Sequence, residues 1–447
     1  MPTFGSYAYI TFGNAKAELA ALLDDSGNVY WSDAELGIYI IESIRTFGGL
    51  SRFFRARGAF SLTSGAPFYD LSAEIPALRG YNVTDEDLIK AMEYHLLEPP
   101  TPTSWTGTDQ FTLSDLSDAL TRRTNQFLLD TSCVMSSSQI ATGVVPSGRF
   151  ALADTTTIVR QVNFQPTGGD WVSLWAEDNW SIDAANNSIQ SPGTPEVYSL
   201  SETPKLTVRL SPAPNLPGTM ELVTVECPAQ FTPPSGAAMN VPDDYTWAIK
   251  FGALADLFGR DGQARDPMRA QYCEQRYQEG VIAARIAASY LDGQIGNAPL
   301  WIDSYVSMQA AIPTWRAAPG TPQIAAALGL NLVAFGPVPD ASYGVSFDVV
   351  SNATVPSADG DFIQVGREEL DVILRYARHL AALKMGGTEF VATFDGWQSM
   401  VKLASQMNSQ LRAYAKDLWA MRDRAQLDRM FKPEFFPTPE KEMEMAQ

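Results

Sequence analysis

The sequence predicts a mixed α+β fold, a helical bundle with an inserted antiparallel β-sheet or sandwich region. Amphipathic helical patterns occupy both ends of the chain, while residues 140–230 contain short β-rich runs separated by Gly, Pro, Asn and Asp. A strand–Pro-x-Pro–strand–helix–helix order also occurs twice, which indicates a duplicated unit.

Residues 1–135 are expected to form a mainly helical N-terminal domain. Ser32 and Glu35 have the spacing of a capping box, and Gly48 and Gly49 are expected to end the helix that this box opens. Apolar residues at helical spacing predict helices over 14–24, 32–47, 84–97 and 112–130.

Strand patterns define a second expected domain over residues 136–232. Its runs are typical of an antiparallel sheet: 158–164, 171–177, 205–210 and 220–225. In the N-terminal domain, residues 58–63 and 68–71 are also expected to be strands. A Ser-Gly-Ala-Pro turn between these two runs predicts that they pair as a hairpin.

A helix pair is expected within residues 233–310 and forms the first copy of the duplicated unit together with the strands of 205–226. The first helix would run from Asp243 to Phe258, and the second from Asp266 to Leu291. Asp243 and Asp244, like Glu368 and Glu369 later in the chain, are interpreted as helix-capping carboxylates. Residues 311–329 are rich in Pro, Gly and Ala and are expected to be a connector.

The second copy of the unit is expected over residues 330–430. Pro212 and Pro214 of the first copy correspond to Pro337 and Pro339 of the second, and each Pro-x-Pro is followed by a strand and two helical segments. The last helix is expected to run from about Thr393 to Arg429. Residues 431–447 would then form an extended C-terminal strap.

Composition narrows the function classes. The chain has 447 residues and a formal charge of −19, which disfavours binding to nucleic acid or an anionic membrane surface. No apolar run is long enough for a membrane span, and the first residues do not resemble a signal peptide. The three cysteines lack zinc-site or disulfide spacing, so we expect reduced, partly buried thiols.

Catalytic motifs are not found in the sequence. It contains no phosphate-binding glycine loop, no His-Glu-x-x-His and no Gly-x-Ser-x-Gly. The two histidines, His95 and His379, lie on patterned helices and are expected to be packed side chains. We therefore expect no catalytic residue, no cofactor and no metal. A glycosidase would need only two facing carboxylates, so this alternative stays open.

The best candidates for contacts between subunits are arginines and aromatic residues. Arg265, Arg269, Tyr272 and Arg276 cluster near a helix break among Asp and Glu residues, which predicts ion pairs and an interface. Phe435 and Phe436 are the corresponding candidates in the strap. The basic and aromatic run 52–57 could alternatively contact nucleic acid.

Two segments resemble a known family. Trp31-Ser-Asp-Ala-Glu-Leu-Gly-Ile-Tyr-Ile-Ile-Glu-Ser-Ile-Arg is similar to the N-terminal helix of head–tail connector or tail adaptor (neck) proteins of tailed bacteriophages. The segment from Val241-Pro-Asp-Asp-Tyr to Arg276-Tyr277 is similar to their paired helices after the β-region. This chain differs from small adaptors in its length, its second strand-and-helix copy and its strap.

The resemblance implies a structural virion protein of the phage neck or tail, assembled in the host bacterial cytoplasm and without enzymatic activity. Such proteins form rings, commonly twelve-fold, that join the portal to the tail. The expected partners are other copies of the chain, the portal protein, tail tube, nozzle or fibre proteins, and no membrane. DNA would pass through the ring without specific binding, and the negative charge predicts an acidic lumen.

Two alternatives remain. Trp171, Trp175 and Trp180 could stack on sugar rings, as in a carbohydrate-binding or receptor-binding module, or a fibre-attachment protein, of the phage tail. A glycosidase or esterase is the third possibility.

Overall fold

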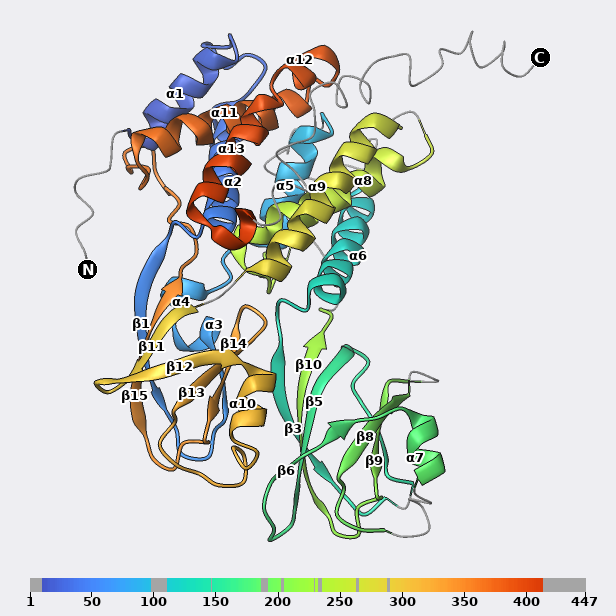
Figure 1. Ribbon diagram of the computed structural model, residues 1–447. Helices are drawn as coiled ribbons and strands as arrows, with labels where there is room; N and C mark the ends of the chain where they lie inside the picture. Colours follow the sequence, from blue (N-terminus) through green and yellow to red (C-terminus); the bar gives the residue numbers. More distant parts are fainter. Residues whose placement is uncertain are drawn as a thin grey trace.

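The computed structural model describes residues 10–97, 111–145, 147–185, 192–201, 205–228, 230–231, 235–262, 265–287 and 290–412. Within these residues the fold is mixed α+β, as expected, with a helical layer at one end and three β-sheets at the other (Figure 1).

Eight longer helices build the helical layer: α1 (Phe12–Leu22), α2 (Asp33–Ser51), α5 (Asp85–His95), α6 (Leu113–Thr131), α8 (Thr246–Gly259), α9 (Pro267–Ile286), α11 (Arg367–Leu383) and α13 (Asp395–Met407). Helices α1, α2, α11 and α13 pack on one another, and α5, α6, α8 and α9 form a second group beside them (Figure 1). One continuous hydrophobic core runs through both groups. The shorter helical segments are α3 (Leu71–Glu74), α4 (Pro76–Arg79), α7 (Asn179–Ala185), η1 (Asp243–Tyr245), α10 (Tyr305–Ala311) and α12 (Gly387–Ala392).

Local capping explains where these helices begin. Thr84 with Asp87, and Thr112 with Asp115, form complete capping boxes at the starts of α5 and α6. The capping box expected at α2 forms only in half. The Ser32 side chain accepts a hydrogen bond from the Glu35 backbone N–H, but the Glu35 carboxylate binds Tyr39 and Lys384 instead.

Helix α2 also continues past its two glycines, contrary to the sequence expectation, and ends in a left-handed residue, Arg52. The glycines serve a close approach instead. A Cβ atom added at Gly49 would lie 2.9 Å from the backbone oxygen of Asp244, so this position lets η1 pack directly on α2.

The largest sheet has seven strands in the order β1-β15-β11-β12-β13-β14-β2. Its strands are β1 (Arg55–Leu62), β2 (Phe68–Asp70), β11 (Tyr290–Ile295), β12 (Ala298–Ser304), β13 (Ile324–Leu328), β14 (Leu332–Gly336) and β15 (Tyr343–Val350). The hairpin expected between residues 58–63 and 68–71 is wrong, because β1 pairs with β15 and β2 pairs with β14. Both strands gain partners from more than 250 residues further along the chain, which local turn signals cannot indicate.

Two four-stranded sheets form the other β-region, with the orders β3-β10-β5-β6 and β4-β9-β8-β7. Their strands are β3 (Ser136–Thr142), β4 (Arg149–Ala151), β5 (Thr156–Pro166), β6 (Val172–Ser173), β7 (Trp175–Ala176), β8 (Val197–Ser201), β9 (Thr207–Ser211) and β10 (Gly218–Glu226). One shared core of buried side chains lies between them. The predicted strands of this region are therefore confirmed as β5, β6 with β7, β9 and β10.

Three boundaries differ from the sequence expectations. The helix expected to reach Leu291 ends at Ile286, and strand β11 begins at Tyr290. The expected connector 311–329 contains strand β13. The long helix expected from Thr393 starts at Asp395 and stops at Met407, where Asn408 takes an extended conformation. Residues beyond Arg412, including the last part of that expected helix (413–429) and the strap, lie outside the described residues.

Candidate assembly interface

The two helix groups meet at a junction that contains buried charges. Lys250 on α8 is fully buried, and its Nζ lies 2.5 Å from Oε2 of Glu42 on α2 and 3.1 Å from Nε2 of His95 on α5. A buried ammonium group is costly unless a carboxylate and hydrogen bonds compensate it. The burial of His95 and the nearby positive charge of Lys250 lower the pKa of His95 well below its usual value, so its neutral ring can accept from Lys250.

A second buried charge, Arg276 on α9, connects α9 with α11 and α13. Its Nη2 donates to the Tyr376 hydroxyl at 2.7 Å, and its Nη1 to Oε2 of Glu279 at 2.8 Å. The guanidinium carbon also lies 3.3 Å from the centroid of the Trp397 ring and 4.8 Å from that of Trp247. These planar contacts require an arginine rather than a lysine.

Tyr272, Thr393 and His379 form a hydrogen-bonded chain across the same junction. The Tyr272 hydroxyl lies 2.8 Å from Nε2 of His379, and Nδ1 of His379 lies 3.0 Å from Oγ1 of Thr393. Burial lowers the pKa of His379 to about 3, so the ring is neutral. Because the Thr393 hydroxyl donates to the Phe390 carbonyl, Nδ1–H donates to Thr393 and Nε2 accepts from Tyr272.

The remaining predicted interface residues lie in different surroundings. Arg269 is half-buried and donates to the Lys384 carbonyl at 3.1 Å, whereas Arg265 is exposed and pairs with Asp261. Tyr272 and Arg276 are buried between helices of this chain, and they connect the two helix groups. Phe435 and Phe436 lie outside the described residues.

The β-regions meet through a second pair of buried charges. Arg316, in the segment between α10 and β13, donates through Nε and Nη2 to both carboxylate oxygens of Glu221 on β10, at 3.0 and 2.9 Å. The Gln139 and Asn163 amides also donate to Glu221. The Arg316 guanidinium carbon lies 4.0 Å from the Trp171 ring centroid, so this tryptophan is occupied within the chain.

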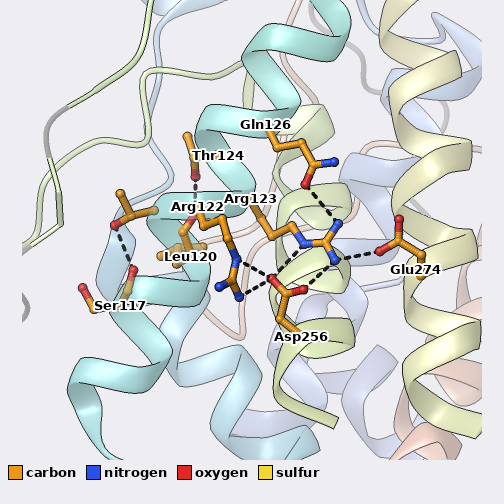
Figure 2. Close-up of polar contacts among 9 residues, drawn as sticks. Ser117, Leu120, Arg122, Arg123, Thr124, Gln126, Asp256 and Glu274 are labelled. Atoms are coloured by element: carbon orange, nitrogen blue, oxygen red, sulfur yellow. Dashed lines mark hydrogen bonds and ion pairs between the residues drawn. The ribbon is translucent and has the colours of Figure 1, made fainter. Parts of the chain in front are cut away.

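Helix α6 presents charged residues that Figure 2 shows in detail. Arg122 and Arg123 both donate to Asp256 of α8, and Arg123 also pairs with Glu274 of α9. Arg123 is buried, whereas the Arg122 side chain keeps 62% of its surface exposed. The inner side of α6 is thus fixed to α8 and α9, while its outer side remains accessible.

The capping role expected for Asp243 and Asp244 is wrong, because neither side chain caps η1 or α8. The Asp243 carboxylate accepts from the backbone N–H groups of Asn82 and Val83, and that of Asp244 accepts from Ala353 N–H. Burial raises the pKa of Asp244 to about 7. These carboxylates connect separate chain segments beneath the helical layer.

Sequence reasoning missed the pairs Lys250–Glu42 and Arg316–Glu221. Lys250 stands in the apolar run Ala248-Ile249-Lys250-Phe251, and a lone lysine in an apolar helix is a usable signal of a buried charge. Its partner could not be identified, because Glu42 lies in a helix far away in the sequence. The packing expected for His95 and His379 is confirmed, and all three cysteines are free thiols.

Within the described residues, no group of three or more His, Cys, Asp and Glu side chains could hold a metal ion. None of the helices in this part of the chain is long and apolar enough to span a bilayer.

The segment from α5 to β11 contains most of this junction, and it has known relatives. Residues 86–294 match the SU10 adaptor protein family. No curated protein matches the chain. The expected relationship to phage neck and tail adaptors is therefore confirmed over this range. Of the two segments that carried the resemblance, the one from Val241 to Tyr277 lies inside the SU10 adaptor match, and Trp31–Arg45 lies outside it. The SU10 adaptor family implies a structural phage protein that binds other virion proteins and is not an enzyme.

Proposed function

We propose that this protein is a ring-forming component of a phage neck, which joins the portal to the tail. The observation that carries this proposal is the SU10 adaptor match over residues 86–294. The buried charge pairs support it, because they fix two helix groups and two β-regions in one orientation, as a load-bearing ring wall would require.

The expected partners follow from this role. Neighbouring copies of the chain would form the ring, the portal protein and a tail tube, nozzle or fibre protein would bind its two ends, and DNA would pass through its lumen. We propose that the exposed Arg265 lies near a contact between chains. Arg269, Tyr272 and Arg276 would support that surface by holding α9 in place.

We also infer the duplicated strand–Pro-x-Pro–strand–helix–helix unit as part of this architecture. In one copy β9 leads through Pro212 and Pro214 to β10, α8 and α9, and in the other β14 leads through Pro337 and Pro339 to β15, α11 and α13. The matched isolated bridges Gly193–Pro214 and Gly320–Pro339, both parallel, support this inference.

A phage that carries an amber codon in this gene tests the proposed function. In a non-suppressing host, it should produce DNA-filled heads and free tails that fail to join. Labelling of complete particles with an antibody against the full chain should place it at the neck. Tailed, infectious particles without the protein would contradict the proposal.

A second candidate function rests on two exposed tryptophans. Trp175 and Trp180 expose 72% and 85% of their surfaces, as carbohydrate-stacking residues would. If the protein is a receptor-binding module, the full chain should bind glycans on a glycan array. The double substitution Trp175→Ala and Trp180→Ala should then abolish this binding. The structural role alone predicts no glycan binding.

A further inference from the structure

We propose that the chain contains two complete adaptor units, one inserted into the other, and that the outer side of α6 binds the next copy of this chain in the ring. This inference rests on the proposed function for its biological setting. It goes further by naming the interaction surface, its partner and the number of units in each chain.

The strand order is the first observation. Strands β6 and β7 are separated only by Leu174, so the two four-stranded sheets join into one path, β3-β10-β5-β6/β7-β8-β9-β4. The seven-stranded sheet follows β1-β15-β11-β12-β13-β14-β2. The two paths match at every step, because each pair of neighbouring strands in one path has the same relative direction, parallel or antiparallel, as the pair at the same place in the other path. The pairs β7–β8 and β12–β13 are parallel, and all the others are antiparallel.

Sequence identities fall at the corresponding places. Leu174-Trp175 matches Leu300-Trp301, and Pro192-Gly-Thr-Pro195 matches Pro319-Gly-Thr-Pro322. The backbone repeats the same contacts, because Trp175 N–H donates to the Glu196 carbonyl at 3.2 Å and Trp301 N–H donates to the Gln323 carbonyl at 2.9 Å. Coincidence of turn residues does not explain identities that share both sheet position and hydrogen bonds.

The helices complete the correspondence. Helices α5 and α6 precede β3 as α1 and α2 precede β1, and the longer helices α8 and α9 follow β10 as α11 and α13 follow β15, where the short α12 lies between them. Helices α2 and α6 each span 19 residues, start after a Ser or Thr cap and end in a left-handed residue, Arg52 or Ser132. The inner unit is therefore the continuous segment Asp85–Ile286. The outer unit consists of the segments before and after it, Phe12–Asp70 and Tyr290–Met407.

The family match agrees with this division, because its range, residues 86–294, covers almost the whole inner unit and extends only a few residues beyond Ile286. In Figure 1 the two units stand side by side, each with its long helices above its own sheet region. Their contact is heterologous: α2 of the outer unit faces η1, α5 and α9 of the inner unit. A heterologous contact that is repeated from copy to copy forms a ring when its rotation closes.

The outer side of α6 is where the next contact would form. Counted from the matching caps Ser32 and Thr112, Glu42 of α2 corresponds to Arg122 of α6, and Gly49 corresponds to Leu129. Glu42 is 8% exposed, because the inner unit covers it. In contrast, the Arg122 side chain is 62% exposed and Leu129 is 43% exposed. The same helix face is thus covered in the outer unit and open in the inner unit.

The occupant that fits is the outer unit of a second copy, because it contains the counterparts of the inner-unit elements that cover α2 within the chain. Its α11 corresponds to α8, whose Lys250 pairs with Glu42 of α2 within the chain. The exposed side of α11 carries charges of both signs that could pair with Arg122, which already donates to Asp256 of its own unit: Arg367, Glu368, Asp371, Arg375 and Arg378. A ring built in this way has twice as many repeating units as chains. A twelve-fold arrangement of units would therefore contain six chains.

Mass measurement and electron microscopy of the ring assembled from the full chain test this inference together. We expect native mass spectrometry to count half as many chains as the lobes seen in unsymmetrised class averages. We also expect Leu129→Asp to lower ring yield at least about tenfold, while the thermal unfolding midpoint of the monomer stays unchanged. The matched control is Val144→Asp, which makes the same change at a 52% exposed site on the β3–β4 connection.

Equal numbers of lobes and chains, or a Leu129→Asp variant that assembles normally, would overturn the inference. Arg122→Glu is a second test, and it should also lower the ring yield. Arg123 still pairs with Asp256 in that variant, so α6 stays attached to α8. These outcomes are separate from a failure of the proposed function. If the chain forms a ring of paired units but that ring is not found in phage necks, the proposed neck role is wrong while the nested duplication still holds.

Discussion

Arg276 of α9 lies with its guanidinium carbon 3.3 Å from the ring centroid of Trp397 in α13, while both residues are almost fully buried. In the nested arrangement proposed above, this contact joins the two units within one chain. Stability and assembly are therefore coupled: a change that loosens this contact alters the relative orientation of the units before it alters either unit alone.

Replacement of Arg276 by Ala should lower the free energy of unfolding by about 3–5 kcal/mol, since it leaves Glu279 buried without its charged partner and opens a space against Trp397. Denaturant unfolding followed by tryptophan fluorescence measures this. The matched control is Arg375→Ala, an exposed i,i+4 ion pair with Asp371, which should change stability by less than about 1 kcal/mol. Equal effects of both variants would contradict the role given to Arg276.

The pair of Lys250 and Glu42 should show strong coupling in a double-mutant cycle. Glu42→Gln leaves the Lys250 ammonium buried without a carboxylate and should cost about 3–5 kcal/mol. Lys250→Met combined with Glu42→Gln should recover much of that loss, because no unpaired charge remains. Additive effects of the two substitutions, measured by chemical denaturation, would show that the ion pair does not set the stability of this junction.

Sequence patterns identified most of the elements but not their partners. The helices α2, α5, α6, α8 and α11 were predictable from apolar spacing and caps, because those signals are local. The partners of β1 and β2 were not, because a long stretch of the chain separates these strands from β15 and β14. The duplication that we propose was recognisable only in part, from the Pro-x-Pro motifs, because in the proposed arrangement the inner unit splits the outer one.

The interface candidates show the same limit. The Arg and Tyr residues of α9 were predicted from their charge pattern to form ion pairs and an interface between subunits, but a single sequence does not distinguish a neighbour within the chain from one in another chain. Tyr272 and Arg276 found their partners on α11 and α13. The buried lysine in α8 was visible in the sequence, yet its meaning depended on Glu42 and His95 from two other helices.

Asp244 should make the protein less stable as pH rises through neutrality. Burial raises its pKa from 3.8 to about 7, against the opposing effects of Arg79 and Arg45. The folded state therefore holds a proton that the unfolded state releases, so the stabilisation is full below pH 4 and is lost as pH rises through 7. The shift corresponds to about 4 kcal/mol. In denaturant unfolding measured from pH 4 to 8, the stability of the wild type relative to Asp244→Asn should fall by about that amount, and a difference that does not depend on pH would exclude this role of Asp244.

His379 should produce the opposite slope over an overlapping range. Burial lowers its pKa from 6.5 to about 3, so its contribution is present above pH 6.5 and is lost as pH falls toward 3. Between about pH 4 and 6.5 these two groups oppose each other, and the lowered pKa of His95 adds to the effect of His379. Asp244→Asn should make stability rise more steeply with pH than in the wild type in this window, while His379→Gln, which can still bond Tyr272 and Thr393, should make it rise less steeply. The same slope in both variants would mean that other groups control the pH response.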